Sequence, residues 1–144
     1  TQARLVQVPR TPGVVVLPIC DQHLGLVLHE RQAIGRTCWE AVRGFGPGNP
    51  MAAAERELIE ETGLEATELI DLGPVHPDSG LMASEARVFA ARIDPGTSPL
   101  AGHEVEAYRW WSTTEVRRMV ASSSITDSFT LAALLKADLR GLLA

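Results

Sequence analysis

The stretch "NPMAAAERELIEETGL" (Asn49–Leu64) decides the central element of this chain. Asn49 can cap a helix N-terminus, and Pro50 suits the first helical position, where no backbone N–H is needed. Gly63 suits the position just past a helix C-terminus, and the residues between are mostly strong helix formers. The sequence therefore predicts a helix over Pro50–Thr62.

Three glutamates of this helix, Glu57, Glu60 and Glu61, are spaced so that their carboxylates project from one side. Like charges at this spacing repel by about a few tenths of a kcal/mol per pair. A surface helix built for stability would intersperse lysines, but Arg56 is the only base within the helix. Two interpretations follow, either a solvated acidic face or a site for a hard cation such as Mg²⁺, which prefers oxygen ligands.

Apolar, β-branched runs on both sides of this helix predict strands. Upstream, the second run follows a turn at Asp21–Gln22, as in a hairpin. Downstream, one strand is expected to end near Gly73. The other predicted strands are Gly13–Cys20, His23–Arg31, Thr37–Val42, Glu85–Ile93 and Glu104–Ser112.

Two further helices are expected near the C-terminus. Ser112 is followed three residues later by Glu115, a capping-box pattern that begins a helix. The segment from Ser128 to Ala144 is predicted to form an amphipathic helix. Strands and helices mix without strict alternation, so the expected fold class is α+β, an α/β/α sandwich with a mixed sheet.

Length and charge narrow the function classes. The 144 residues suit a single domain over 1–144. A net charge of −5 argues against a nucleic-acid polymer as partner, although a metal ion could still recruit a small phosphorylated ligand. Without an apolar run of membrane-spanning length or a signal-peptide pattern, we expect no membrane partner and a cytoplasmic location. Cys20 and Cys38 are expected to be reduced, buried thiols.

The segment "RELIEETGL" (Arg56–Leu64) agrees at every defined position with the core of the Nudix box, Arg-Glu-aliphatic-x-Glu-Glu-x-Gly-aliphatic. The chain thus resembles a Nudix hydrolase, and the sandwich is expected to be Nudix-type. Three further segments look like parts of the ADP-ribose pyrophosphatase branch. They are "LVLHERQAIGRTCWEAVRGFG" (residues 26–46), "HPDSGLMASEARVFAARI" (76–93) and "ITDSFTLAALL" (125–135).

The resemblance implies hydrolysis of a nucleoside diphosphate linked to another moiety, ADP-ribose or a related nucleotide sugar, by water attack on the diphosphate. It implies Mg²⁺ as cofactor, with Mn²⁺ as an alternative. The implied metal ligands are Glu57 and Glu61, with Glu60 as a further ligand and the main-chain carbonyl of Arg43. Arg56 is implied to orient a metal-binding glutamate.

The resemblance further implies Glu104 as the catalytic base, with Glu106 as the alternative. It places Arg31 at a substrate phosphate, Glu40 near the adenosine or ribose end, and Gly44 in the loop beside the substrate. Other interpretations stay open for two of these residues. Arg31 could be an exposed strand-end arginine, and Glu40 could pair structurally with an arginine such as Arg36 or Arg43.

The chain departs from the family pattern before the helix. Eleven residues separate Gly44 from Arg56, two fewer than in the family's box, and the first glutamate of the box has no counterpart. Asn49 is its nearest equivalent. This departure motivates an alternative function, a Nudix-fold module that binds or senses a nucleotide metabolite without hydrolysis. A homodimer, the branch's usual assembly, is a further expectation.

Overall fold

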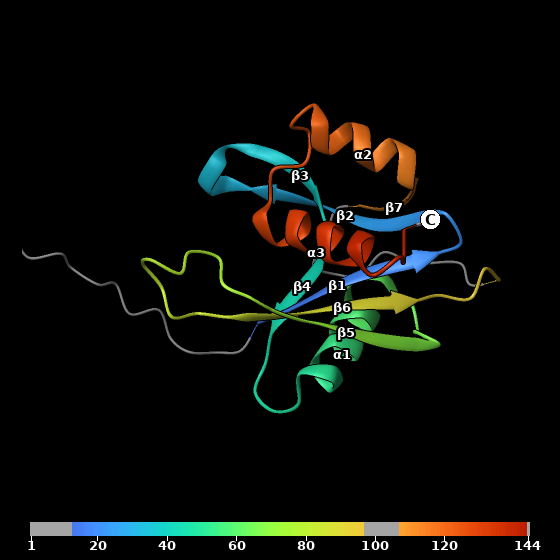
Figure 1. Ribbon diagram of the computed structural model, residues 1–144, viewed down its shortest axis with the longest axis horizontal. Coiled ribbons are helices and arrows are strands. Elements are labelled where there is room, and N and C mark those ends of the chain that lie inside the picture. The colour runs from blue at the N-terminus through green and yellow to red at the C-terminus, as the bar shows by residue number, and fades with distance from the viewer. Residues whose placement is uncertain (1–12, 97–106, 144) are drawn as a thin grey trace, which may run out of the picture.

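The computed structural model describes residues 13–96 and 107–143 as three layers, with a mixed sheet between helices (Figure 1). The predicted α/β/α sandwich is therefore confirmed. The strands are β1 (Gly13–Cys20), β2 (His23–Arg31), β3 (Arg36–Glu40), β4 (Val42–Phe45), β5 (Glu68–Val75), β6 (Ala86–Arg92) and β7 (Ala107–Ser112). The helices are α1 (Pro50–Thr62), α2 (Thr113–Ala121) and α3 (Ser128–Leu139), with a short 3₁₀ turn, η1 (Gln32–Ile34).

The strand β1 organises the sheet. It pairs in parallel with β6 along one edge, and β6 pairs antiparallel with β5. On its other edge, β1 pairs with β2 only at Ile19 and Cys20, and with β4 over Gly13–Val16. Since β2 continues away and pairs with β3 and β7, the sheet divides between β1 and β2. The chain crosses this division at Ala41, between β3 and β4.

The alternation of side chains along β1 feeds two hydrophobic cores. Val14 and Val16 face α1, where they belong to a cluster that includes the buried Leu58 and Phe89. Val15, Leu17 and Ile19 belong to the opposite cluster, beneath α2 and α3. Figure 1 shows α3 across the front of the sheet and α1 behind it. Each fully buried leucine or phenylalanine of these cores contributes about 1.5–3 kcal/mol relative to an exposed one.

The helix predicted from the acidic stretch has the expected bounds and caps. The side chain of Asn49 accepts hydrogen bonds from the backbone of Met51 (2.8 Å) and Ala52 (3.4 Å), and the helix ends at Gly63 with φ 72°. The capping box at Ser112 is also confirmed, since Ser112 and Glu115 exchange side-chain-to-backbone hydrogen bonds of 3.1 Å.

Two predicted elements differ in the structure. The single strand predicted over Thr37–Val42 is two strands, because the chain leaves the β2 ladder after Glu40 and joins β1 from Val42. The C-terminal helix ends at Leu139 rather than at the chain end, and its exposed side carries leucines beside the polar Ser128 and Asp138. Leu135 and Leu139 there are 60% and 77% exposed. The predicted strand from Glu104 is described from Ala107 onward, so its first three residues lie outside the described part.

None of the helices in the described ranges is both long enough and apolar enough to span a bilayer.

Candidate active site

The acidic side of α1 divides into buried and exposed carboxyl groups. Glu57 and Glu61 are buried, at 7% and 2% exposure. The Glu60 side chain is about half exposed, at 48%. Arg56 lies between them, with its guanidinium 3.8 Å from the Glu57 carboxylate and 4.0 Å from that of Glu60. The helix therefore places two of these acids, Glu57 and Glu60, beside Arg56.

The end of β4 lies directly against this helix. A Cβ atom added at Gly44 would overlap the carboxyl group of Glu57, and one added at Gly46 would overlap the guanidinium of Arg56. Glycine at both positions lets the backbone of β4 and the loop after it approach these side chains this closely, and a larger residue would displace the Glu57 carboxyl group or the Arg56 guanidinium. Arg43, whose main-chain carbonyl is the predicted ligand, immediately precedes Gly44. The structure thus brings the predicted loop and the predicted acids together.

These residues fit a divalent cation by their chemistry. In the ranges 13–96 and 107–143, no three His, Cys, Asp or Glu side chains form a ready-made metal cage. Mg²⁺ does not require one, since it is usually held by one or two carboxylates together with water and substrate phosphates. Glu57 and Glu61, one helical turn apart, and the Arg43 carbonyl would supply oxygen ligands only, which suit a hard cation.

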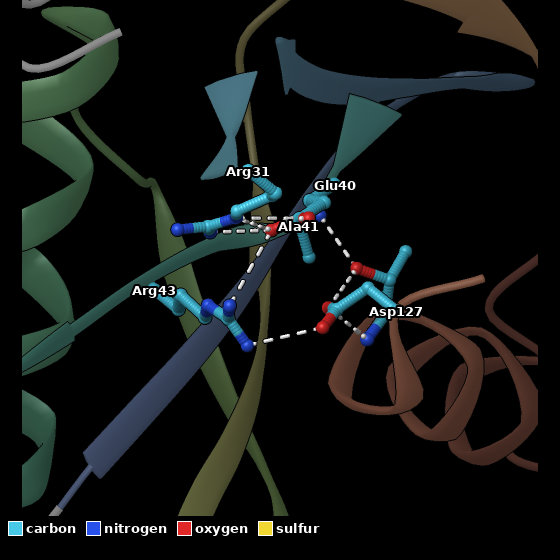
Figure 2. Close-up of polar contacts among 6 residues, drawn as sticks. Arg31, Glu40, Ala41, Arg43 and Asp127 are labelled. Atoms are coloured by element: carbon cyan, nitrogen blue, oxygen red, sulfur yellow. Dashed lines mark hydrogen bonds and ion pairs between the residues drawn. The ribbon is translucent and has the colours of Figure 1, made fainter. Parts of the chain in front are cut away.

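A second polar group lies at the division of the sheet (Figure 2). Arg31 donates from Nε to both carboxylate oxygens of Glu40, at 3.1 Å each, and from Nη2 to Oε1 at 2.5 Å. The Glu40 side chain is 3% exposed, and Arg43 approaches it at 3.6 Å. The hydrogen bond to Glu40 is the main cause that raises the pKa of Arg31. Two residues predicted separately as substrate contacts therefore bind each other.

The same group extends to the start of α3. Asp127 accepts a hydrogen bond from Arg43 at 3.0 Å, and it caps α3 by accepting from the backbone N–H of Thr130, also at 3.0 Å. Sequence analysis placed Asp127 only within the segment "ITDSFTLAALL" that resembles the ADP-ribose pyrophosphatase branch. Asp127 stands directly before the helix predicted from Ser128, and an aspartate there is a favoured N-cap, a signal that could have identified it.

His29 on β2 lies within the electrostatic influence of the second polar group. Its pKa is lowered, first by burial and then by the nearby Arg31. Its Nε2 atom is buried and makes no hydrogen bond within the described part of the chain. A neutral imidazole therefore suits this place on β2 better than a charged one.

Four further residues named in the sequence analysis have separate outcomes. Glu104 and Glu106, the candidate bases, lie outside the described residues. Arg36, considered as a partner of Glu40, instead donates to the main-chain oxygen of Ser124 at 3.3 Å. Asn49, which stands nearest to the first glutamate of the box, is engaged as the cap of α1.

Fold and site together define an α/β/α sandwich in which a glycine-bearing strand end lies on an acid-rich helix. A family model of the Nudix domain matches residues 9–128. The chain therefore belongs to the Nudix family, and the family prediction made from Arg56–Leu64 is confirmed.

Among solved structures, the crystal structure of an ADP compounds hydrolase is similar to this chain, with a TM-score of 0.76 and 23% sequence identity. The similarity covers 91% of this chain and 75% of the other, and at this identity it supports the fold. No curated protein matches the chain by sequence.

Proposed function

We propose that the chain is a Mg²⁺-dependent Nudix hydrolase that cleaves a nucleoside diphosphate linked to another moiety. The observation that carries this proposal is the contact between Gly44 and the buried Glu57, on a helix where Glu57, Glu60 and Glu61 outnumber the single base Arg56. A purely structural helix gains nothing from such an excess of carboxylates. A bound cation would balance it.

ADP-ribose or a related nucleotide sugar is the proposed substrate class. The resemblance of three segments to the ADP-ribose pyrophosphatase branch supports it, as does the similar fold of an ADP compounds hydrolase. Water would add to one phosphorus and the bridging P–O bond would break, so that ADP-ribose would yield AMP and ribose 5-phosphate. A bound Mg²⁺ supplies neutralisation of the diphosphate charge and acidifies water.

The proposed division of labour among side chains follows the geometry. Arg56, within 4.0 Å of two glutamates and pressed against Gly46, keeps the carboxylates oriented. Arg31 is the proposed phosphate contact, since its side chain is 30% exposed even though it is paired with Glu40. Glu104 is the proposed base that accepts the proton of the attacking water, with Glu106 as the alternative.

One observation favours a second function, the binding of a nucleotide metabolite without hydrolysis. Asn49 stands nearest to the missing first glutamate of the box, and its side-chain oxygen is occupied by the backbone of α1. It therefore supplies no charge to a metal. Hydrolysis remains the better-supported function, because the missing acid lies outside the group formed by Glu57, Glu60 and Glu61.

A panel assay distinguishes the two functions. The chain would be incubated with Mg²⁺ and ADP-ribose, other nucleoside diphosphate sugars, NADH, diadenosine polyphosphates and nucleoside triphosphates, and release of AMP or phosphate would be followed. We expect turnover of a diphosphate that is lost in Glu61→Gln and retained in Glu55→Gln. The second variant is the matched control, because Glu55 is an exposed acid of the same helix. Tight binding of one compound with no turnover of any would favour the binding module.

A further inference from the structure

The crossing between β3 and β4 is held by a helix that is distant in the sequence. Ala41 belongs to neither strand, and its buried N–H donates to the hydroxyl of Thr130, on α3, at 3.0 Å. Thr130 is fully buried. A buried amide outside a strand ladder needs such a partner, because leaving it unsatisfied is costly.

The direction of this hydrogen bond determines the next one. Because the Ala41 amide can only donate, the Thr130 oxygen accepts, and its own proton is donated to Asp127 Oδ2 at 2.7 Å. The other oxygen of Asp127 accepts from Arg43 at 3.0 Å. The start of α3 therefore holds the β3–β4 crossing at two points, the main chain of Ala41 and the side chain of Arg43 (Figure 2).

These contacts exceed what a helix cap requires. The cap of α2 satisfies its helix by an exchange between Ser112 and Glu115. Asp127 likewise caps α3 through the Thr130 amide, but it also receives the Thr130 hydroxyl and the Arg43 guanidinium. The additional bonds reach the strand that ends on the acidic helix.

The strand β4 links this contact to the acids of α1. Arg43, held by Asp127, is followed by Gly44, whose backbone lies against the Glu57 carboxyl group. We propose, on the basis of the proposed function, that Asp127 and Thr130 are positioning residues that hold the Arg43–Gly44 backbone in register with the metal-binding glutamates. Neither residue would touch substrate or metal.

The first test removes the hydroxyl without changing the size of the side chain. Thr130→Val should weaken Mn²⁺ binding, measured by calorimetry without substrate, by about tenfold, the loss usual for residues that support metal ligands. Thr130→Ser keeps the hydroxyl and should restore the wild-type affinity. The matched control is Ser112→Ala, which weakens the cap of another helix and should leave Mn²⁺ affinity unchanged.

A second readout requires no metal. Amide hydrogen exchange over residues 41–46 should become at least tenfold faster in Thr130→Val but not in Ser112→Ala, because the Ala41 amide loses its acceptor. Asp127→Ser is a second variant, at a side chain that is less buried than that of Thr130. Serine still caps the helix but no longer receives Arg43, and the same two changes are expected.

Specific results would overturn the proposal. Folded Thr130→Val and Asp127→Ser proteins with wild-type Mn²⁺ affinity and wild-type exchange over 41–46 would contradict it, as would equal losses in Ser112→Ala. A wild-type chain that hydrolyses none of the compounds would contradict the proposed function instead. The exchange rates would then still test whether Thr130 and Asp127 hold the backbone of residues 41–46 in place.

Discussion

Two acidic groups lie on either side of β4, and their charges are balanced differently. On α1, the guanidinium of Arg56 lies within 4.0 Å of the Glu57 and Glu60 carboxylates, and Glu61 is buried one helical turn beyond Glu57. At the sheet division, two carboxylates, Glu40 and Asp127, are matched by the guanidinium groups of Arg31 and Arg43. Among the side chains named here, acids outnumber bases in the first group and equal them in the second.

This difference suggests that the group on α1 binds a ligand, whereas the group at the sheet division stabilises the fold. A neutral, hydrogen-bonded group satisfies its own charges and stabilises the crossing of two strands. A group with excess negative charge is stable only at some cost unless a cation joins it. Substitutions in the first group should therefore affect activity and metal binding most, and substitutions in the second should affect stability most.

Among the substitutions that test the contact of β4 with α1, the largest effect is expected for Gly44→Ala. The new methyl group would overlap the end of the Glu57 side chain. This side chain can move aside at a modest cost in stability, but its carboxylate would then leave the proposed metal site. We expect kcat/KM for ADP-ribose to fall about 10- to 100-fold. Gly96→Ala is the control, since its Cβ meets no atom of the described residues closer than 3.4 Å. Unchanged activity of Gly44→Ala would contradict the claim that the close approach of β4 positions the Glu57 carboxylate.

The next effect is on stability. Glu40→Gln deprives Arg31 and Arg43 of a charged, buried partner, and we expect the free energy of unfolding to fall by about 2 kcal/mol. This figure is below the loss expected for a fully buried ion pair, because solvent reaches Arg31 and screens its interaction with Glu40. Urea denaturation measures this change, and Glu60→Gln, which alters a half-exposed acid, should change stability by less than about 0.5 kcal/mol. Equal changes in both variants would contradict the comparison.

A smaller stabilisation should come from the metal itself. At a Mg²⁺ concentration ten times its dissociation constant, binding to the folded state adds about 1.4 kcal/mol to the free energy of unfolding. Thermal denaturation with and without Mg²⁺ measures this as a rise in Tm. The rise should be absent in Glu61→Gln and should persist in Glu40→Gln. A rise of the same size in Glu61→Gln would place the cation elsewhere.

The smallest effect concerns pH. Burial and the charge of Arg31 lower the pKa of His29 below 6.5, against the opposing charges of Glu40 and Asp127. The unfolded state then binds the proton more readily, so this contribution to stability is full above about pH 6.5 and is lost as pH falls through the folded-state value. His29→Gln should flatten the decline in the urea midpoint between pH 7 and 5. The exposed His23→Gln should not, and a similar flattening in both would contradict this role for His29.

The sequence predicted the elements that depend on local signals. The caps at Asn49 and Ser112, the hairpin of β1 and β2 and the bounds of α1 all follow from neighbouring residues. The acidic side of α1 could also be predicted, because helical spacing and a family motif coincide over Arg56–Leu64.

Contacts between distant residues could not be predicted in the same way. Sequence analysis considered Arg36 and Arg43 as partners of Glu40, and Arg43 does lie 3.6 Å from it. The hydrogen bonds from Arg31 could not be predicted, because the β2–β3 register places Arg31 opposite Arg36 and Glu40 opposite Val27. The break at Ala41 depends on a hydroxyl 89 residues away. No local pattern distinguishes such a crossing from a continuous strand.

The most direct test of the central claim is the release of AMP from ADP-ribose by the wild-type chain, Glu61→Gln and Glu55→Gln across a Mg²⁺ titration. We predict turnover that rises with Mg²⁺ in the wild-type chain, a loss of about 100-fold or more in Glu61→Gln, and retained turnover in Glu55→Gln, whose side chain is exposed on the same helix. Equal loss in both variants, or turnover that does not depend on Mg²⁺, would contradict the assignment of the metal site to α1.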